Sequence, residues 1–386
     1  MDDVRNSPSH SLEERLSGDP TRSSKYDENG IALCCSGGGY KSASYQIGAY
    51  IRLNELGVLR DISRITSVSG GSITTAFLAL CWKDLEWTGK VSTNFIDVFA
   101  RPLALKLKTV SIDAGAIFKS LVPGLNGAKA LEKAYRKHFF GDAGLATFPD
   151  PELGKTPDFM ILATDYELNS LWRFSKRYSS NYRVGLTWRA DLPVARIVAA
   201  SSGFPPFFCP VKQSWAGFDF DTQYADRHNS PYKDRALLAD AGIYDNLGLE
   251  PIWKRYGTLL VSNAGDPFGE VDAPRSWFPV LRRAMSMIHR QAENNRVRWL
   301  FSLDKRGDRK LVYWPLRAPE PPYSTPNPYF LSEAEAKSAR NEAVRLKAMN
   351  PNAFLRLACH GYAMCDYAVR GKLPHYDGPN PEWPRL

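Results

Sequence analysis

The first residues that could do chemistry are a serine and the glycines beside it, in the stretch SVSGGS at 67–72. Ser69 follows an apolar run of strand length and precedes an apolar run of helix length, which is the context of a nucleophile elbow. Small neighbours are needed there because the sharp turn crowds the backbone around the serine. The usual pattern is G-x-S-x-G; here Ser67 replaces the first glycine and Gly71 keeps the last. Ser69 is therefore a candidate nucleophile, although a plain strand-to-helix turn has a similar composition.

Three adjacent glycines, Gly37–Gly39, stand at a second junction, directly after the apolar run at 31–36. Bare backbone can approach a reacting group closely, and its N–H groups can stabilise the negative oxygen that forms during acyl transfer. Lys41 adds a positive charge nearby. A P-loop would need glycine directly before Lys-Ser, where Tyr40 stands, and a dinucleotide fingerprint would need a third glycine where Ser42 stands. The glycines therefore favour an oxyanion site.

A nucleophilic serine needs a base, and Asp240 ends an apolar strand in LLADAG at 237–242. The carboxyl ends of parallel strands face the crevice where such sheets bind ligands, so we expect Asp240 to reach the crevice of Ser69. An ordinary aspartate has a pKa of about 3.9, so burial must raise that pKa or the oxyanion site must supply most of the rate. A Ser-His-Asp triad with His289 or His360 is the open alternative, since the order along the chain suits it. Both histidines, however, fall within helical patterns.

Strand and helix patterns alternate along the chain. Strands are predicted at 31–36, 64–69, 158–167, 170–175, 236–242 and 258–265, and helices at about 43–57, 72–82, 191–203, 277–301, 332–346 and 353–371. Asp191 is the expected N-cap of its helix, and Ser332 with Glu335 predicts a capping box. Strand, glycine turn, helix and strand again is typical of βαβ units. We therefore predict one α/β domain with a mostly parallel central sheet and a helical C-terminal flank.

The composition is that of a globular chain, with 386 residues of which 44% are hydrophobic and 24% charged. A formal net charge of +9 suggests an anionic partner or simply a basic surface; without a recognisable motif, nucleic acid is not expected. The six cysteines have no metal-ligand spacing and are typical of small core residues in a reducing compartment. No signal peptide or membrane-spanning stretch is evident. We expect a cytoplasmic protein with peripheral membrane contact and neither cofactor nor metal.

Taken together, these motifs resemble those of the patatin-like phospholipases. SGGGYKS at 36–42 is similar to that family's glycine-rich oxyanion motif, SVSGG at 67–71 to its nucleophile motif, and DAG at 240–242 to its D-G-[GA] aspartate motif. The motifs occur in the family's order, and the resemblance extends from about residue 31 to 369. Their combination is far more specific than any one motif.

The resemblance implies a three-layer α/β/α fold and a serine ester hydrolase of phospholipase A or lysophospholipase type, acting on a phospholipid or lysophospholipid through a Ser-Asp dyad and an acyl-enzyme. Ser69 would be the nucleophile and Asp240 the general base. The oxyanion donors would be the amides of Gly37, Gly38, Gly39 and Gly70. Lys41 stands where the family usually has arginine, which keeps a supporting charge but loses the bidentate fork. Ala241 stands where glycine is usual, which affects the turn beside Asp240.

The remaining segments give coarser expectations. The chain would divide into a flexible leader (1–29), the acyl hydrolase domain (30–371, with catalytic motifs at 36–72 and 240–242 and a C-terminal helical part at 277–371) and a tail (372–386). The mixed apolar and basic stretch 94–110 is a candidate lid, and the basic amphipathic helix 277–301 a candidate contact for anionic headgroups. Core packing and a solvated helix face are the alternatives. A catalytically silent lipid-binding protein on the same scaffold is the alternative to an enzyme.

Overall fold

The structure is a computed structural model that describes residues 26–112, 127–206, 208–223, 225–265, 276–317, 331–383 and 386, without the side chains of Phe278, Arg282 and Glu333. The first 25 residues of the expected leader thus lie outside the described residues. The last residues of that leader belong to the first strand, which begins at Asp27.

A ten-stranded sheet forms the centre of the molecule. Its strands, with a small hairpin of β3 and β4, are β1 (Asp27–Cys35), β2 (Ile62–Ser67), β3 (Trp87–Thr88), β4 (Val91–Ser92), β5 (Asp158–Asp165), β6 (Ser170–Phe174), β7 (Tyr178–Asn181), β8 (Gly185–Trp188), β9 (Val211–Ser214), β10 (Arg235–Asp240), β11 (Tyr256–Asn263) and β12 (Lys310–Pro315). The order is β12-β11-β1-β2-β5-β6-β7-β8, and β10 joins β5 and β9. Strands β12, β11, β1, β2 and β5 are mutually parallel, whereas the pairs beyond β5 are antiparallel.

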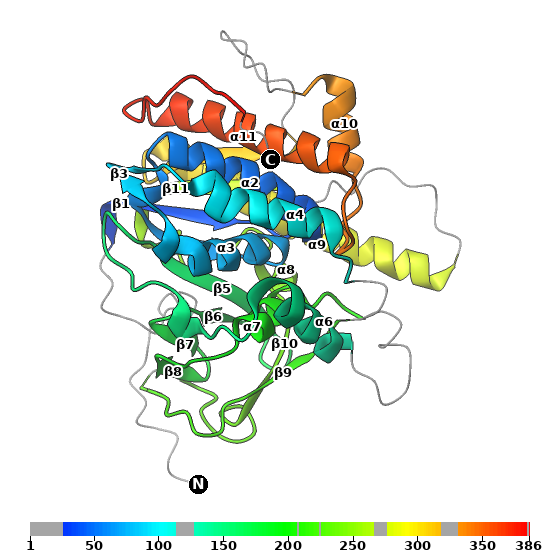
Figure 1. Ribbon diagram of the computed structural model, residues 1–386. Helices are drawn as coiled ribbons and strands as arrows, with labels where there is room; N and C mark the ends of the chain where they lie inside the picture. Colours follow the sequence, from blue (N-terminus) through cyan, green and yellow to red (C-terminus); the bar gives the residue numbers. More distant parts are fainter. Residues whose placement is uncertain are drawn as a thin grey trace.

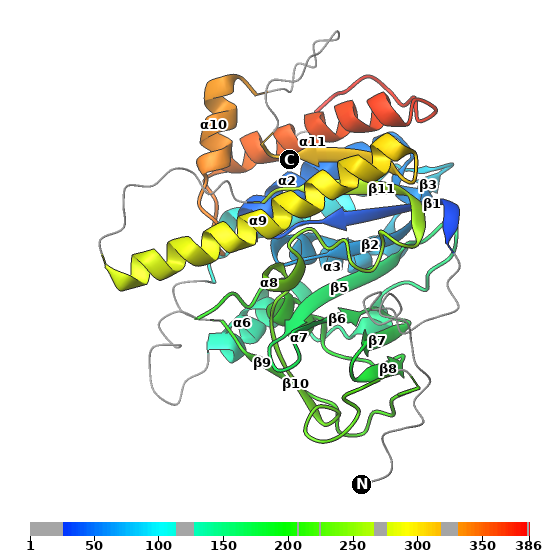
Figure 2. The ribbon, with the colours of Figure 1, turned by 180° about the vertical axis from the view of Figure 1, so that it is seen from behind.

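Helices cover both faces of this sheet. They are α2 (Gly39–Glu55), α3 (Gly70–Cys81), α4 (Arg101–Thr109), α6 (Gly127–Tyr135), α7 (Val194–Ser201), α8 (Gly242–Asp245), α9 (Trp277–Arg306), α10 (Glu333–Asn341) and α11 (Pro351–Lys372). Figure 1 shows α2, α3, α4 and α11 in front of the sheet, and Figure 2 shows α9 crossing the opposite face. The predicted three-layer α/β/α fold with a mostly parallel central sheet is confirmed.

The strand β1 shows how its sequence serves two cores at once. Its residues alternate between the faces of the sheet: Ile31, Leu33 and Cys35 join the large core under α2 and α3. Ala32 and Cys34 join a second core on the face that α9 covers. A strand buried on both sides therefore appears as a continuous apolar run, which is why the pattern at 31–36 predicts it correctly.

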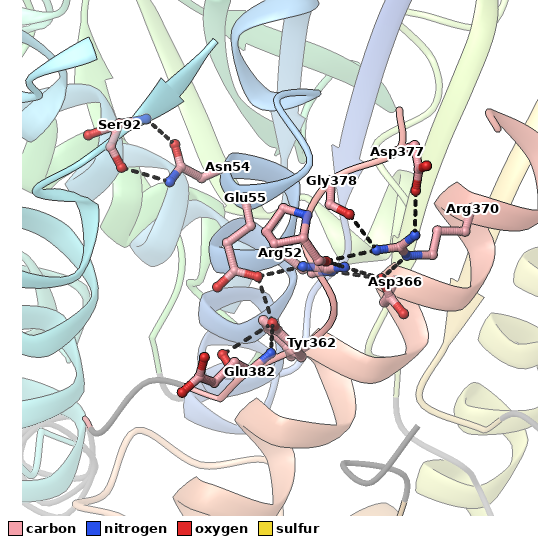
Figure 3. Close-up of polar contacts among 11 residues, drawn as sticks. Arg52, Asn54, Glu55, Ser92, Tyr362, Asp366, Arg370, Asp377, Gly378 and Glu382 are labelled. Atoms are coloured by element: carbon pink, nitrogen blue, oxygen red, sulfur yellow. Dashed lines mark hydrogen bonds and ion pairs between the residues drawn. The ribbon is translucent and has the colours of Figure 1, made fainter. Parts of the chain in front are cut away.

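The C-terminal helix α11 is fixed to α2 by a buried ionic cluster (Figure 3). The Arg52 guanidinium contacts Asp366 at 2.6 Å and Glu55 at 2.7 Å. Its third partner is the carbonyl of Pro379, at 2.8 Å in the C-terminal tail. Tyr362 also donates to Glu55 at 2.6 Å. A buried charge with several partners tolerates little movement, so α11 and the tail hold α2, the helix that begins at the glycine triplet, in a fixed place.

Three local expectations are wrong. Asp191 does not cap α7, because its carboxylate accepts the Ala146 N–H at 2.9 Å and Pro193 takes the N-cap position. The capping box at Ser332 is present, but α10 ends at Asn341 rather than near residue 346. The chain after Asn341 packs against the start of α2, where the Arg345 carbonyl accepts the Tyr40 N–H.

The third concerns the candidate lid at 94–110, which is an interior element. Its large apolar side chains are buried in the main core and include Phe95, Phe99, Leu103 and Leu107. Leu105 is the exposed exception, at 59%. An amphipathic stretch packed in this way covers α2 and offers no broad apolar surface to a membrane.

Candidate active site

Ser69 occupies the turn between β2 and α3, in a backbone conformation that L-residues rarely adopt. Its φ is 51° and its ψ −119°. Such left-handed geometry at a non-glycine residue is strained and persists only where the surroundings enforce it. The following glycine shows why small neighbours are needed: a Cβ at Gly70 would overlap the Gly39 carbonyl oxygen and lie 2.7 Å from the Gly39 nitrogen. The turn expected for a nucleophile elbow is therefore present at Ser69.

Asp240 reaches Ser69 by a route that differs from the expected one. β2 runs parallel to β5 until Ser67 stands opposite Ile161. β10 runs antiparallel along the same side of β5, with Asp240 opposite Ala163, while β6 covers the other side. The carboxyl ends of β2 and β10 therefore meet head to head along β5. The expectation that Asp240 ends a parallel strand is wrong, but the antiparallel approach still brings Asp240 beside Ser69.

The two side chains are buried neighbours. The Ser69 side chain lies near enough to the Asp240 carboxyl to lower the pKa of that carboxyl, and the Gly242 N–H donates to Oδ1 of the same carboxylate at 2.8 Å. Burial removes water from the carboxylate and raises the pKa of Asp240 to about 6, while the Gly242 N–H and the Ser69 side chain limit the rise. A carboxylate with that pKa is a stronger base than an exposed aspartate and is still mostly ionised at neutral pH.

The glycine amides divide into two groups. The Gly37 N–H donates to the carbonyl of Asn246 at 3.2 Å, so this amide already has an acceptor. In the described part of the chain, the amides of Gly38, Gly39 and Gly70 donate to no protein acceptor. Gly39 (φ 58°) begins α2 and Gly70 begins α3, with their backbones in close contact. Two helix N-termini, each with a positive partial charge, therefore converge beside Ser69.

Lys41 is buried one turn into α2, and its ammonium donates to the carbonyl of Arg340 in α10 at 2.7 Å. The neighbouring Tyr40 N–H donates to the carbonyl of Arg345 at 2.9 Å. These contacts fix the start of α2, and with it Gly39, against the chain that leaves α10. The structure thus gives Lys41 an anchoring contact, and its role as a supporting charge stays a prediction.

Residues around Ser201 belong to the site, although their roles are not evident from the sequence. The Ser69 N–H donates to Oγ of Ser201 at 3.0 Å, and Oγ of Ser72 lies 2.8 Å from the same oxygen. The Gly203 carbonyl accepts the Asp240 N–H at 3.1 Å. The end of α7 therefore holds both halves of the pair. The sequence offers one hint of these residues, since the stretch AASSGFPPFFCPV at 199–211 also resembles the patatin-like phospholipases.

The two histidines considered for a triad have other neighbours. His360 in α11 bonds through Nε2 to the Leu316 carbonyl at 3.2 Å, packs edge-on against Tyr45, and has its pKa lowered to about 4 by burial. His289 in α9 has its pKa lowered by burial, with Glu293 opposing that effect. Within the described residues, the groups that act on the pKa of Asp240 are Gly242 and Ser69, with no histidine among them.

Comparison with known proteins now places this site in a family. A family model described as "Patatin-like phospholipase" matches residues 33–253, more than half of the chain. The chain belongs to the patatin-like phospholipases. The matched range contains the glycine triplet, the serine turn and the aspartate strand. No curated protein sequence matches the chain.

Solved structures resemble this chain at low sequence identity. Human GIVD cytosolic phospholipase A2 matches with a TM-score of 0.56 and 12% identity, over 90% of this chain and 62% of that chain. The present chain therefore spans less than two thirds of the human phospholipase. VipD from Legionella pneumophila matches with a TM-score of 0.38 and 14% identity, over 90% of this chain and 68% of that chain. At 12% identity the likeness to the human phospholipase concerns the fold alone.

Proposed function

We propose that this patatin-like protein hydrolyses the acyl esters of phospholipids or lysophospholipids, with Ser69 as nucleophile and Asp240 as general base. The observation that supports this most directly is the strained, buried Ser69 beside a carboxylate whose pKa burial raises to about 6. A plain strand-to-helix turn needs neither the strained backbone nor the buried partner. Nucleophilic catalysis uses both.

In the first step, the Ser69 oxygen attacks the ester carbonyl carbon while its proton moves to the Asp240 carboxylate. Because the pKa of Asp240 is about 6, the base is mostly ionised at pH 7 yet able to hold the proton briefly. The tetrahedral intermediate then expels the alcohol, which takes the proton from Asp240, and the acyl group stays on Ser69. Water, deprotonated by Asp240, releases the fatty acid and restores the hydroxyl.

The negative oxygen of the intermediate would be stabilised by the amides at the starts of α2 and α3. Gly38, Gly39 and Gly70 are the donors we assign, since each lacks a protein acceptor among the described residues. Gly37 takes a supporting role, because its N–H is bound to the Asn246 carbonyl. Donors of this kind typically contribute about a hundredfold to a thousandfold in rate each, since they are already aligned where the charge develops.

The first test is covalent labelling and turnover. A fluorophosphonate probe should modify the protein at Ser69, and Ser69→Ala should abolish both labelling and hydrolysis of a soluble short-chain ester. Asp240→Asn should lower kcat by roughly a thousandfold or more, since the serine loses its base. Ser302→Ala, in the exposed part of α9, is the matched serine control and should change neither readout.

The histidines provide the contrasting outcome. His289→Ala and His360→Ala should each keep ester hydrolysis, since neither imidazole acts on Asp240. A folded histidine variant without activity would support a triad, and labelling that survives in Ser69→Ala would reject the assignment of the nucleophile. Turnover of phospholipid, lysophospholipid and neutral ester substrates side by side would then define the headgroup preference.

A further inference from the structure

The N-terminal half of α9 turns its apolar side outward. Its large exposed side chains are Trp277 (77% exposed), Val280 (48%), Leu281 (50%), Met285 (56%), Met287 (56%) and Ile288 (71%). The spacing of Leu281, Met285 and Ile288 at i, i+4 and i+7 places these three on one side of the helix. A continuous exposed apolar side of this kind is rare on proteins that meet only water.

The C-terminal half of the same helix behaves in the ordinary way. Leu300 and Leu303 are buried in the second core, and Val297 packs against it, next to the β1 and β11 side chains. Following that inward side toward the N-terminus in steps of three or four residues leads to Glu293, His289 and Ser286, which are polar and half-buried. The helix therefore keeps one orientation while its pattern reverses: the inward side becomes polar and the outward side apolar.

This projecting half lies at the same end of the sheet as Ser69. α9 connects β11 to the parallel strand β12, so it begins at the carboxyl ends of the parallel strands, where the glycine triplet and Ser69 also lie. Figure 2 shows it extending beyond the sheet from that end. A direct link exists as well, because Glu293 accepts from the side chain of Asn246 at 2.9 Å, and the carbonyl of Asn246 accepts the Gly37 N–H.

The charges near this side fit an anionic surface. Residues 277–292 contain three arginines and no aspartate or glutamate. Anionic lipid headgroups attract such a segment, and the apolar side can enter the headgroup–acyl boundary below them. A second copy of the chain fits less well, because antiparallel pairing of two such helices would bring arginine toward arginine, and the apolar stripe is shorter than a stable coiled coil needs.

We propose that residues 277–292 of α9 lie in the surface of an anionic lipid membrane with their apolar side inserted, and that this contact holds Ser69 at the membrane surface. The segment lies in the interface rather than across it, since no helix among the described residues has the length and apolar content to traverse a bilayer. The membrane as the source of substrate rests on the proposed lipid hydrolase function, whereas the binding itself does not.

The test separates binding from chemistry. The triple variant Leu281→Ser/Met285→Ser/Ile288→Ser should lose affinity for vesicles of phosphatidylcholine and phosphatidylglycerol by about a thousandfold, measured by flotation, because each of the three lost aliphatic contacts is worth roughly tenfold. Its turnover of a soluble short-chain ester should equal that of the wild type, and its turnover of the same vesicles should fall with binding. The matched control is Leu105→Ser/Leu153→Ser/Leu355→Ser, which removes three exposed leucines from other elements and should float normally.

The possible outcomes are distinct. Normal flotation of the triple variant, or equal flotation of the wild type with phosphatidylcholine vesicles lacking phosphatidylglycerol, would overturn the proposal. So would a wild-type dimer in solution that fails to float and that the triple variant dissociates, which would assign the apolar side to a second copy. A wild type that floats but does not hydrolyse the soluble ester would instead reject the proposed function and leave the membrane contact intact.

Discussion

The Ser69 site and the projecting half of α9 are built in opposite ways. At the Ser69 site, the Ser69 amide is bound to Ser201 and the Asp240 carboxylate to the Gly242 amide, and the whole group is buried. Along residues 277–292 the large apolar side chains face solvent, at exposures up to 77%. The proposed catalysis at Ser69 depends on the positions of a few atoms. The proposed membrane binding by α9 depends on the total apolar area that the helix can remove from water.

This difference implies two kinds of sensitivity to mutation. At the Ser69 site, a displacement of a few tenths of an ångström would move the proposed amide donors away from the negative oxygen of the intermediate. Single substitutions there should therefore have large effects on the rate of ester hydrolysis. On α9 each side chain adds its own area, so effects on binding should accumulate gradually. Variants of the Ser69 site should therefore leave vesicle flotation unchanged. A variant of this site that alters both ester hydrolysis and flotation would show that the two regions are not independent.

Outside the Ser69 and Asp240 pair, the largest expected effect on the rate is that of Gly70→Ala. The new Cβ would overlap the carbonyl oxygen of Gly39, which is backbone and cannot swing away, so the starts of α2 and α3 must separate. We expect ester hydrolysis to fall by about a hundredfold or more, since oxyanion donors are displaced, while vesicle flotation persists. Gly371→Ala is the matched control, because a Cβ there meets no atom within 4 Å and the position is helical. Wild-type activity in Gly70→Ala would contradict the convergence of the two helix starts.

Local patterns of the sequence were sufficient to predict the elements that carry the candidate site. The apolar runs before Ser69 and Asp240 are strands as predicted, and the glycine triplet begins a helix. These features depend on neighbours in the chain. The short strands β7, β8 and β9 escaped prediction, because segments such as YSSN and VKQS have no apolar run and pair only where a neighbouring strand is available.

What the sequence could not predict depends on contacts between distant segments. Asp240 reaches Ser69 because β10 joins β5 in the antiparallel direction, which no local pattern specifies. Asp191 is a residue type that commonly caps helices, but its carboxylate accepts the Ala146 N–H instead. The amphipathic pattern of α9 is visible in the sequence, yet only packing decides which side of the helix faces outward, and along residues 277–292 it is the apolar side that does.

Asp240 gives a second test through stability. Its pKa is about 6 in the folded protein against 3.8 as the ordinary value, so between these pH values the folded state binds more protons than the unfolded state. The free energy of unfolding of the wild type should therefore fall as pH rises from about 4 to about 6, by about 3 kcal/mol from this group, and level off above. Over the same range kcat/KM should rise, because the base becomes ionised.

Asp240→Asn isolates that contribution. The amide oxygen can keep the bond from the Gly242 N–H, and no buried charge remains, so this variant should be more stable than the wild type at pH 7 by up to about 3 kcal/mol while almost inactive. Denaturant unfolding at pH 4 and pH 7 measures both. If the difference between wild type and variant is the same at the two pH values, the carboxylate does not titrate in this range. Flotation of Asp240→Asn should again be unaffected, which would show that the destabilisation by the buried carboxylate is local to the Ser69 site.

Ser201→Ala should have the smallest of these effects. It removes the acceptor of the Ser69 N–H and leaves that amide unpaired in a buried turn, which costs about 1–3 kcal/mol. We expect Ser69 to remain in place, since Gly71 and Ser72 still bond to the Val68 and Ser69 carbonyls, so kcat should fall only about tenfold. Ser202→Ala is the adjacent control: its hydroxyl donates to Val198 and leaves the Ser69 amide paired. Equal losses in the two variants would mean that α7 supports the site through packing rather than through the Ser201 hydroxyl.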